Sequence, residues 1–160
     1  MKQLLSIISI ALISFGGKSQ NISYTSISDL QYVSPTDLAN CNDTSSYYGD
    51  TVMTYGIVVV PGDVSEVASG SVQGGHRPFI FIVDTVGNGA PGPFRGIEIM
   101  GVYTNNQGQL LPLPNIEYLL PGDLIKFTGT LSDYNNGTQI EALNGNSLQV
   151  IGSRPTPSPA

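Results

Sequence analysis

Short runs of alternating or continuous apolar residues recur between residues 50 and 150, each bounded by Gly, Pro, Asn or Asp. Five of these runs have the length and composition of β-strands, at 50–60, 79–84, 96–103, 122–131 and 139–143. Before the fourth run, residues 115–120 favour one or two helical turns that end at Pro121. The pattern predicts an all-β domain, a small and partly open five-stranded barrel with a short helical segment before strand 4.

The alternation also assigns faces to the strands. In the fourth strand Ile125, Phe127 and Leu131 share the face expected in the core, while Lys126 marks the face expected in solvent. The second strand is apolar on both faces. Such a strand is either covered on both sides or presents its aromatic side chains to a ligand.

The segments on either side of the strands have different characters. Residues 1–19 combine a short positive start, an apolar stretch and small residues before Gln20, which is typical of a cleaved signal peptide. We therefore expect a secreted or cell-surface protein with no stable membrane anchor. Residues 20–46 form an N-terminal extension, and 47–152 form the barrel domain. Within the extension, residues 26–31 fit a strand or a helical turn, and the pattern leaves open whether the extension covers the barrel.

The last residues, 153–160, carry proline at alternate positions and should be extended. A linker to a longer protein and a frayed terminus both fit this composition, and the sequence leaves open whether the natural chain continues past Ala160.

Charge and cysteine content narrow the possible functions. Without residues 1–19 the chain has four basic and twelve acidic residues, a net charge of −8. This is unfavourable for a polyanionic partner, because phosphate binding draws on clustered Lys and Arg. Cys41 is the only cysteine, so no internal disulfide forms, and we expect a buried or loop thiol rather than a nucleophile.

The order of the strand motifs resembles a known family. Residues 48–58 follow a G-x-x-V…G-I-V pattern, 79–84 an aromatic strand that ends in Asp, and 121–130 a G-D-x-V-x-V-x-G-T pattern. Over residues 45–150 the chain looks like the OB-fold modules of secreted bacterial proteins that occur beside extracellular nucleases. The departures are Val83, where the family has a polar residue, and the long Gly-rich loop before Phe79. The resemblance implies a five-stranded OB-fold-like Greek-key barrel.

In an OB-fold the ligand lies on strands two and three and on the loops that join strands 1–2 and 4–5. The candidate ligand-binding residues at these places are His76, Arg77, Phe79, Phe81, Arg95, Tyr103, Tyr134 and Asn135. Aromatic and basic side chains suit single-stranded bases, and aromatic and amide side chains suit a sugar. In the alternative, Phe79 and Phe81 fill the barrel, Tyr134 packs over its hairpin, and Arg77 and Arg95 pair with Asp84 or Glu98.

No catalytic centre, metal site or cofactor is predicted. His76 is the only histidine and has no evident orienting partner, and Asp84 with Asn88 lacks the regular ligand spacing of a calcium loop. We expect a non-catalytic extracellular binding module whose ligand is single-stranded nucleic acid or glycan. The alternatives are a structural or interaction protein that meets a protein partner through an edge strand, and an accessory domain of a longer secreted enzyme.

Overall fold

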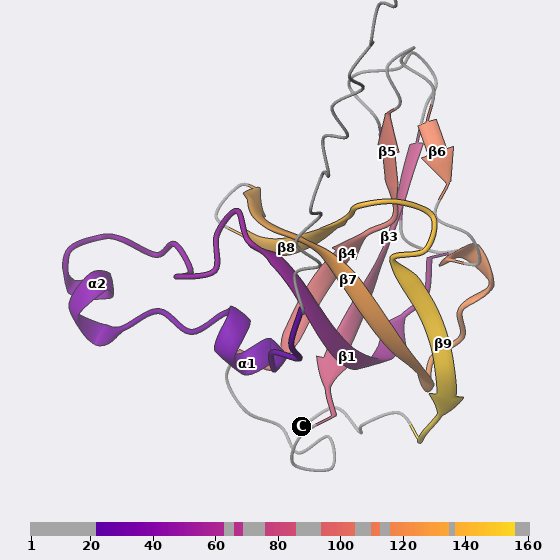
Figure 1. Ribbon diagram of the computed structural model, residues 1–160, viewed down its shortest axis with the longest axis horizontal. Coiled ribbons are helices and arrows are strands. Elements are labelled where there is room, and N and C mark those ends of the chain that lie inside the picture. Colours follow the sequence, from indigo (N-terminus) through magenta and orange to yellow (C-terminus); the bar gives the residue numbers. More distant parts are fainter. Residues whose placement is uncertain are drawn as a thin grey trace, which may run out of the picture.

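Five strands form a closed barrel (Figure 1). The computed structural model describes residues 22–62, 66–68, 76–85, 94–104, 110–112, 116–134 and 137–155. The barrel strands are β1 (Thr51–Val60), β3 (His76–Asp84), β4 (Gly96–Met100), β7 (Asp123–Tyr134) and β8 (Gly137–Ala142). The sequence predicted a partly open barrel. In the structure the sheet closes on itself, because β1 pairs with β7 from Thr51↔Thr130 to Ile57↔Leu124.

The strands follow the order β1-β3-β4-β8-β7, and β7 returns to β1. Neighbouring strands are antiparallel except β4 and β8, which run parallel. The five barrel strands correspond to the five predicted ones, with shifted ends.

The predicted faces of the fourth strand are confirmed in β7. Ile125, Phe127 and Leu131 are buried, and Lys126 is only half-buried on the opposite face. Gly129 lies on the buried face, where a Cβ atom would collide with the carbonyl oxygen of Glu141 and approach Ile140 Cγ2 to 2.6 Å. Glycine at this position therefore lets β8 cross close to β7.

The predicted third strand is wrong in its last part. It was expected to run to residue 103, but β4 ends at Met100, and Val102–Thr104 form β5. β5 pairs with β6 (Leu110–Pro112) in a separate two-stranded sheet that projects beyond the barrel (Figure 1). The break falls at Gly101, whose N–H donates to the Pro78 carbonyl at 2.9 Å, and where a Cβ atom would lie 2.8 Å from that same oxygen.

Besides β6, two further strands of the described residues were not expected. β2 (Glu66–Ala68) pairs with the first residues of β3, inside the predicted Gly-rich loop. β9 (Leu148–Ser153) follows the fifth predicted strand and pairs with the first half of the 12-residue β7. β8 pairs with the second half of β7, so β8 and β9 lie one after the other along the same edge.

Short helical segments close the two ends of the barrel. The segment expected before the fourth barrel strand is the 3₁₀ turn η1 (Ile116–Tyr118), where Ile116 is fully buried and contacts the Pro78–Gly101 end. At the other end lies α1 (Ile27–Leu30), whose Ile27 and Leu30 are fully buried in the same core as Phe127. Ser28 of α1 donates its hydroxyl to the Asp84 carboxylate at 3.4 Å.

The N-terminal extension therefore covers the barrel in part. Residues 27–30 are helical, and the preceding segment pairs with β1 through Tyr24↔Met53. By contrast, α2 (Pro35–Ala39) has no buried residue and extends to one side of the molecule (Figure 1).

The predicted signal peptide, 1–19, and residues 156–160 of the tail lie outside the described residues. Among the helices that the structure describes, none is long and apolar enough to cross a membrane.

Candidate functional site

The outward surface of β3, β4, β8 and β7, called here the outer face, carries a row of side chains that crosses four strands. Strand register places Phe81 opposite Glu98, Glu98 opposite Gln139, and Gln139 opposite Ser132. Because Ile80, Ile82, Ile97 and Ile99 belong to the core, their neighbours in sequence on β3 and β4 point outward.

Two side chains of this row, Ser132 and Gln139, form hydrogen bonds with each other and with the nearby Glu141. The Gln139 amide donates to Ser132 Oγ at 3.1 Å and to Glu141 Oε1 at 2.9 Å. The Ser132 hydroxyl donates to the same Glu141 oxygen at 3.0 Å. Gln139 is only 5% exposed, so its side chain is fixed by both burial and hydrogen bonds. A network satisfied in this way presents polar atoms in a set geometry, which lowers the cost of binding.

Aromatic side chains lie on both sides of this network. Phe79 and Phe81 contact each other edge to face, with 5.6 Å between ring centroids and 87° between planes. Phe81 is 37% exposed and Tyr134, at the end of β7, is 66% exposed. By way of β4 and β8, three strand spacings separate β3 from β7, which is about 14 Å along the curved surface of the closed barrel. The interval suits an extended ligand that contacts both aromatic positions.

Glycines begin the two strands between these aromatic positions. Gly137 pairs with Tyr134, and Gly96 pairs with Val83. These two positions therefore add no side chain to the outer face.

Three of the residues predicted to bind ligand lie at outward positions of the barrel, with Phe79 and Phe81 in contact on β3 and Tyr134 at the end of β7. Phe79, Phe81 and Tyr134 all lie on the outer face, so the alternative in which both phenylalanines fill the barrel is wrong. Arg95 directly precedes β4 and is half-buried, and its carbonyl accepts the Asp84 N–H at 2.8 Å.

The other predicted residues are only partly described. His76 and Arg77 begin β3 and pair with Ala68 and Val67 of β2, and their side chains lie outside the described part. Tyr103 was expected to close the third barrel strand but lies on β5, opposite Leu111. Asn135 lies outside the described residues.

Sequence reasoning missed Ser132, Gln139 and Glu141. In the sequence, Gln139 and Glu141 alternate with the apolar Ile140, which indicates that both lie on one face of the strand. In the structure Ile140 is buried. Their partner Ser132 could be found only from the register between β7 and β8, in which Ser132 pairs with Gln139.

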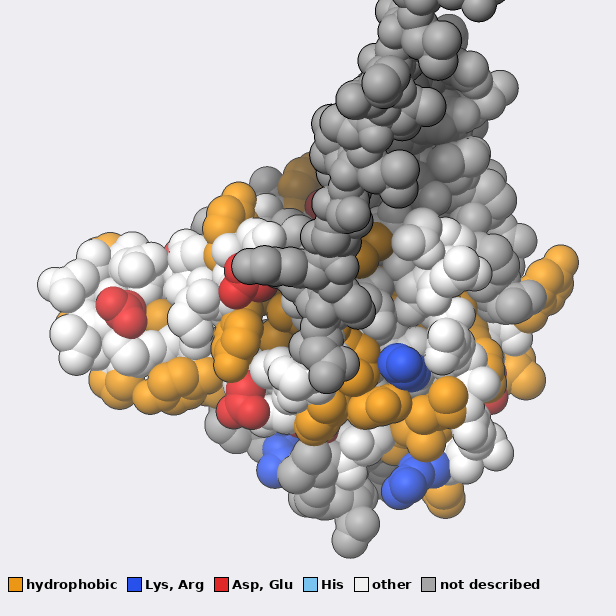
Figure 2. All heavy atoms as spheres, viewed as in Figure 1, with side chains coloured by type: hydrophobic (Ala, Val, Ile, Leu, Met, Phe, Trp, Pro, Cys, Tyr) orange, Lys and Arg blue, Asp and Glu red, His pale blue; other side chains and the backbone are white. Residues whose placement is uncertain are grey.

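Among the side chains that the structure describes, the outer face carries the two carboxylates of Glu98 and Glu141. Basic side chains of the described residues are scattered over the surface seen in Figure 2, with hydrophobic side chains between them. They are Arg95, Lys126 and Arg154. This distribution is unlike the basic stripe that follows a nucleic-acid backbone.

Groups suited to metal binding do not gather in the described part of the chain. There, no three His, Cys, Asp or Glu residues are close enough together to hold a metal ion. Cys41 is exposed and directly follows the C-cap of α2, so the expectation of a buried thiol is wrong and that of a loop thiol is met.

No family model matches the chain, and no curated protein matches it either.

Proposed function

We propose that this protein is a non-catalytic, extracellular binding module with an OB-fold-like Greek-key barrel. The strand order β1-β3-β4-β8-β7, the β1–β7 closure and the parallel β4–β8 pair support this assignment. The short helical turn between the third and fourth barrel strands supports it as well. In such a barrel the second and third strands carry the ligand. Here those strands are β3 and β4, which contribute Phe81 and Glu98 to the outer face.

The ligand proposed for the outer face is an uncharged glycan strand. The single observation that carries the proposal is the pair of exposed aromatics, Phe81 and Tyr134, on either side of the Ser132–Gln139–Glu141 network. Aromatic rings stack on the apolar faces of sugar rings, and carboxylate and amide oxygens accept hydrogen bonds from sugar hydroxyls.

Nucleic acid is the less favoured ligand for this surface. Glu98 and Glu141 would lie close to a bound phosphate backbone, and their charge repels it. The net charge of the whole chain, −6, acts in the same direction.

The test is a titration of soluble polysaccharides by calorimetry, with Phe81→Ala and Tyr134→Ala as variants. Loss of one aromatic contact removes about 0.5–1.5 kcal/mol beyond its buried area, so each variant should bind about tenfold more weakly. Tyr118→Ala is the matched control, because Tyr118 is 78% exposed but lies on η1, away from the outer face.

A second titration uses a single-stranded oligonucleotide at low salt. We expect no binding. Affinity for the oligonucleotide that falls steeply with salt would replace the glycan by nucleic acid as the ligand. Equal glycan affinity of the wild type and both aromatic variants would contradict the proposed site.

A second candidate function is a structural or interaction role, and the β9 edge favours it. Within the described residues β9 pairs only with β7, so its other edge is open. Val150 and Ile151 are 52% and 48% exposed, and β9 contains neither proline nor a charged residue. Open edges of this kind add an extended segment of a partner protein as a further strand.

This candidate predicts a stable protein complex recovered from the cell surface, which Val150→Lys weakens. A lysine on an edge strand disfavours strand addition because its charge must be buried in the contact. Tyr134→Ala is the control and should leave the complex intact. A complex that is unchanged by Val150→Lys would exclude the β9 edge as its contact.

A further inference from the structure

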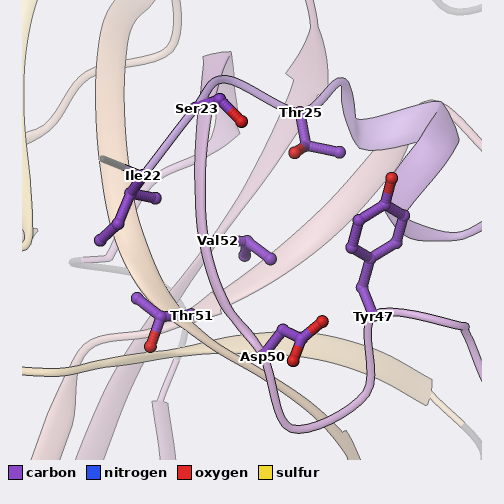
Figure 3. A pocket seen from close by; sticks show the side chains of 7 residues that line it. All are labelled: Ile22, Ser23, Thr25, Tyr47, Asp50, Thr51 and Val52. Atoms are coloured by element: carbon purple, nitrogen blue, oxygen red, sulfur yellow. The ribbon is translucent and has the colours of Figure 1, made fainter. Parts of the chain in front are cut away.

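A pocket of about 380 Å³ lies away from the outer face, between the N-terminal segment and the start of β1. Its lining residues are Ile22, Ser23, Thr25, Tyr47, Asp50, Thr51 and Val52. Figure 3 shows Thr25, Tyr47, Asp50 and Val52 around the same space, with Ile22, Ser23 and Thr51 beyond Val52. The volume falls in the range of small-molecule sites, about 300–1,000 Å³.

Backbone hydrogen bonds tie both walls of this pocket to the barrel. On one side the Thr25 N–H donates to the Met53 carbonyl at 2.9 Å. On the other side the Gly49 N–H donates to the Leu131 carbonyl at 2.9 Å, and the Leu131 N–H donates to the Asp50 carbonyl at 3.0 Å. The two walls belong to different parts of the chain but are fixed to the same sheet, so the pocket is formed before any ligand binds.

The polar side chains of the pocket are available to a ligand. In the part of the chain that the structure describes, the side chains of Ser23, Thr25, Tyr47, Asp50 and Thr51 make no hydrogen bond to another protein group. The hydroxyl groups can donate and accept, and the carboxylate of Asp50 can accept. The aliphatic side chains of Ile22 and Val52 and the ring of Tyr47 add apolar surface.

These groups select the chemistry of the ligand. The lining contains one carboxylate and no Lys, Arg or His, so a phosphate or carboxylate ligand would be repelled by Asp50 and would find no cation to offset that repulsion. An ammonium ion could donate to Asp50 but offers no acceptor to the four hydroxyl groups. A neutral polyol does both, since each of its hydroxyls donates and accepts, and its C–H surface fits the apolar residues.

We propose that this pocket binds a single sugar ring or a neutral polyol of similar size, independently of the outer face. The carboxylate of Asp50 accepts two sugar hydroxyls, and the hydroxyls of Thr25 and Tyr47, which surround the same space, bond to the others. The site goes beyond the proposed function, because it takes one ring rather than a strand and uses none of the residues of the outer face.

The test follows backbone amide signals by nuclear magnetic resonance during titration of the complete chain with D-glucose, D-mannose and D-galactose. A ring of about twelve heavy atoms at about 0.3 kcal/mol per atom corresponds to a dissociation constant of about 1 mM, so binding should be weak but saturable. We expect shifts confined to residues 22–25 and 47–52 for at least one sugar. Asp50→Ala should weaken binding at least tenfold, because a hydrogen bond to a charged acceptor is lost. Thr25→Val, which keeps the shape of the side chain, should weaken it less.

Two controls separate this site from the outer face and from a cation site. Tyr134→Ala should leave the shifts and the affinity unchanged, whatever the outcome for polysaccharides. Methylammonium and inorganic phosphate are the charged probes, and neither should produce saturable shifts in the pocket. The proposal is overturned if no sugar gives saturable shifts at residues 22–25 and 47–52. It is also overturned if methylammonium or phosphate binds there and sugars do not, or if sugar binding survives Asp50→Ala unchanged.

Discussion

At the scale of single residues, Tyr24 shows how the fold changes the chemistry of a side chain. Its ring lies against that of Tyr55, with 5.3 Å between centroids and an angle of 37°. Burial raises the pKa of the Tyr24 phenol above its usual value of 10.0, and the nearby carboxylates of Asp84 and Asp29 raise it further. The folded protein therefore favours the neutral phenol more than the unfolded chain does.

This shift predicts a loss of stability at alkaline pH. Between the unfolded pKa of 10.0 and the higher folded pKa, the unfolded chain binds fewer protons, so the free energy of unfolding falls as pH rises. The contribution is complete below pH 10 and is lost as pH rises through the folded pKa. Tyr24→Phe should lose less stability than the wild type between about pH 9 and pH 11, measured by urea unfolding.

The control for Tyr24→Phe is the same comparison at about pH 7, where the phenol is neutral in both states. Any difference there reports packing rather than titration. An identical alkaline loss in the variant and the wild type would show that Tyr24 does not contribute to it.

At the scale of elements, α1 is a helix whose stability depends on its contacts. It has four residues, far fewer than an isolated helix needs. The side chain of Ser26 caps it by accepting the Asp29 N–H at 3.1 Å. Ile27 and Leu30 lie fully buried in the barrel core, so packing against the barrel holds the helix in place.

Truncation of either buried residue of α1 should destabilise the whole barrel. Leu30→Ala or Ile27→Ala should reduce the free energy of unfolding by about 2–5 kcal/mol, because each leaves a cavity in the core. Leu38→Ala is the matched control in α2, where Leu38 is 50% exposed, and it should change stability by less than about 0.5 kcal/mol. Urea unfolding measures all three, and a small effect at Leu30 would mean that α1 is not part of the cooperative core.

At the scale of the whole molecule, a single hydrophobic core joins the barrel to both of its ends. Ile27 of α1, Ile116 of η1 and Phe127 of β7 belong to the same cluster of buried residues. Domains with one such core usually unfold in one cooperative step.

We therefore predict one unfolding transition for the described body of the protein. The midpoint in urea should be the same by far-ultraviolet circular dichroism, which follows the sheet, and by tyrosine fluorescence, which is accessible because the chain has no tryptophan. Hydrogen exchange at Leu30 should report the same free energy as exchange at Phe127. Earlier opening at Leu30 would indicate that α1 unfolds as a separate unit.

Much of the barrel could be predicted from the sequence, because the information that defines a strand and its faces is local. Alternation over a few residues identified the core face of β7, with Ile125, Phe127 and Leu131. Alternation did not identify the candidate site residues Phe81 and Tyr134, which came from the resemblance to OB-fold modules. The same local signal did not predict the end of β4 at Gly101, because that break depends on the Pro78 carbonyl of a different strand.

The amino-acid sequence by itself determined where the five barrel strands lie to within shifted ends, which side chains of β7 are buried, and that the chain is acidic with few basic groups. Only the tertiary structure decided that β1 and β7 close the barrel, that α1 covers one end, and that Ser132, Gln139 and Glu141 meet. It also decided that the Thr25 and Asp50 walls of the pocket lie together. The physical reason is that periodicity reports only which way a side chain points. Which side chain lies next to it on the neighbouring strand is set by strand register and barrel closure, and these depend on residues far apart in the chain.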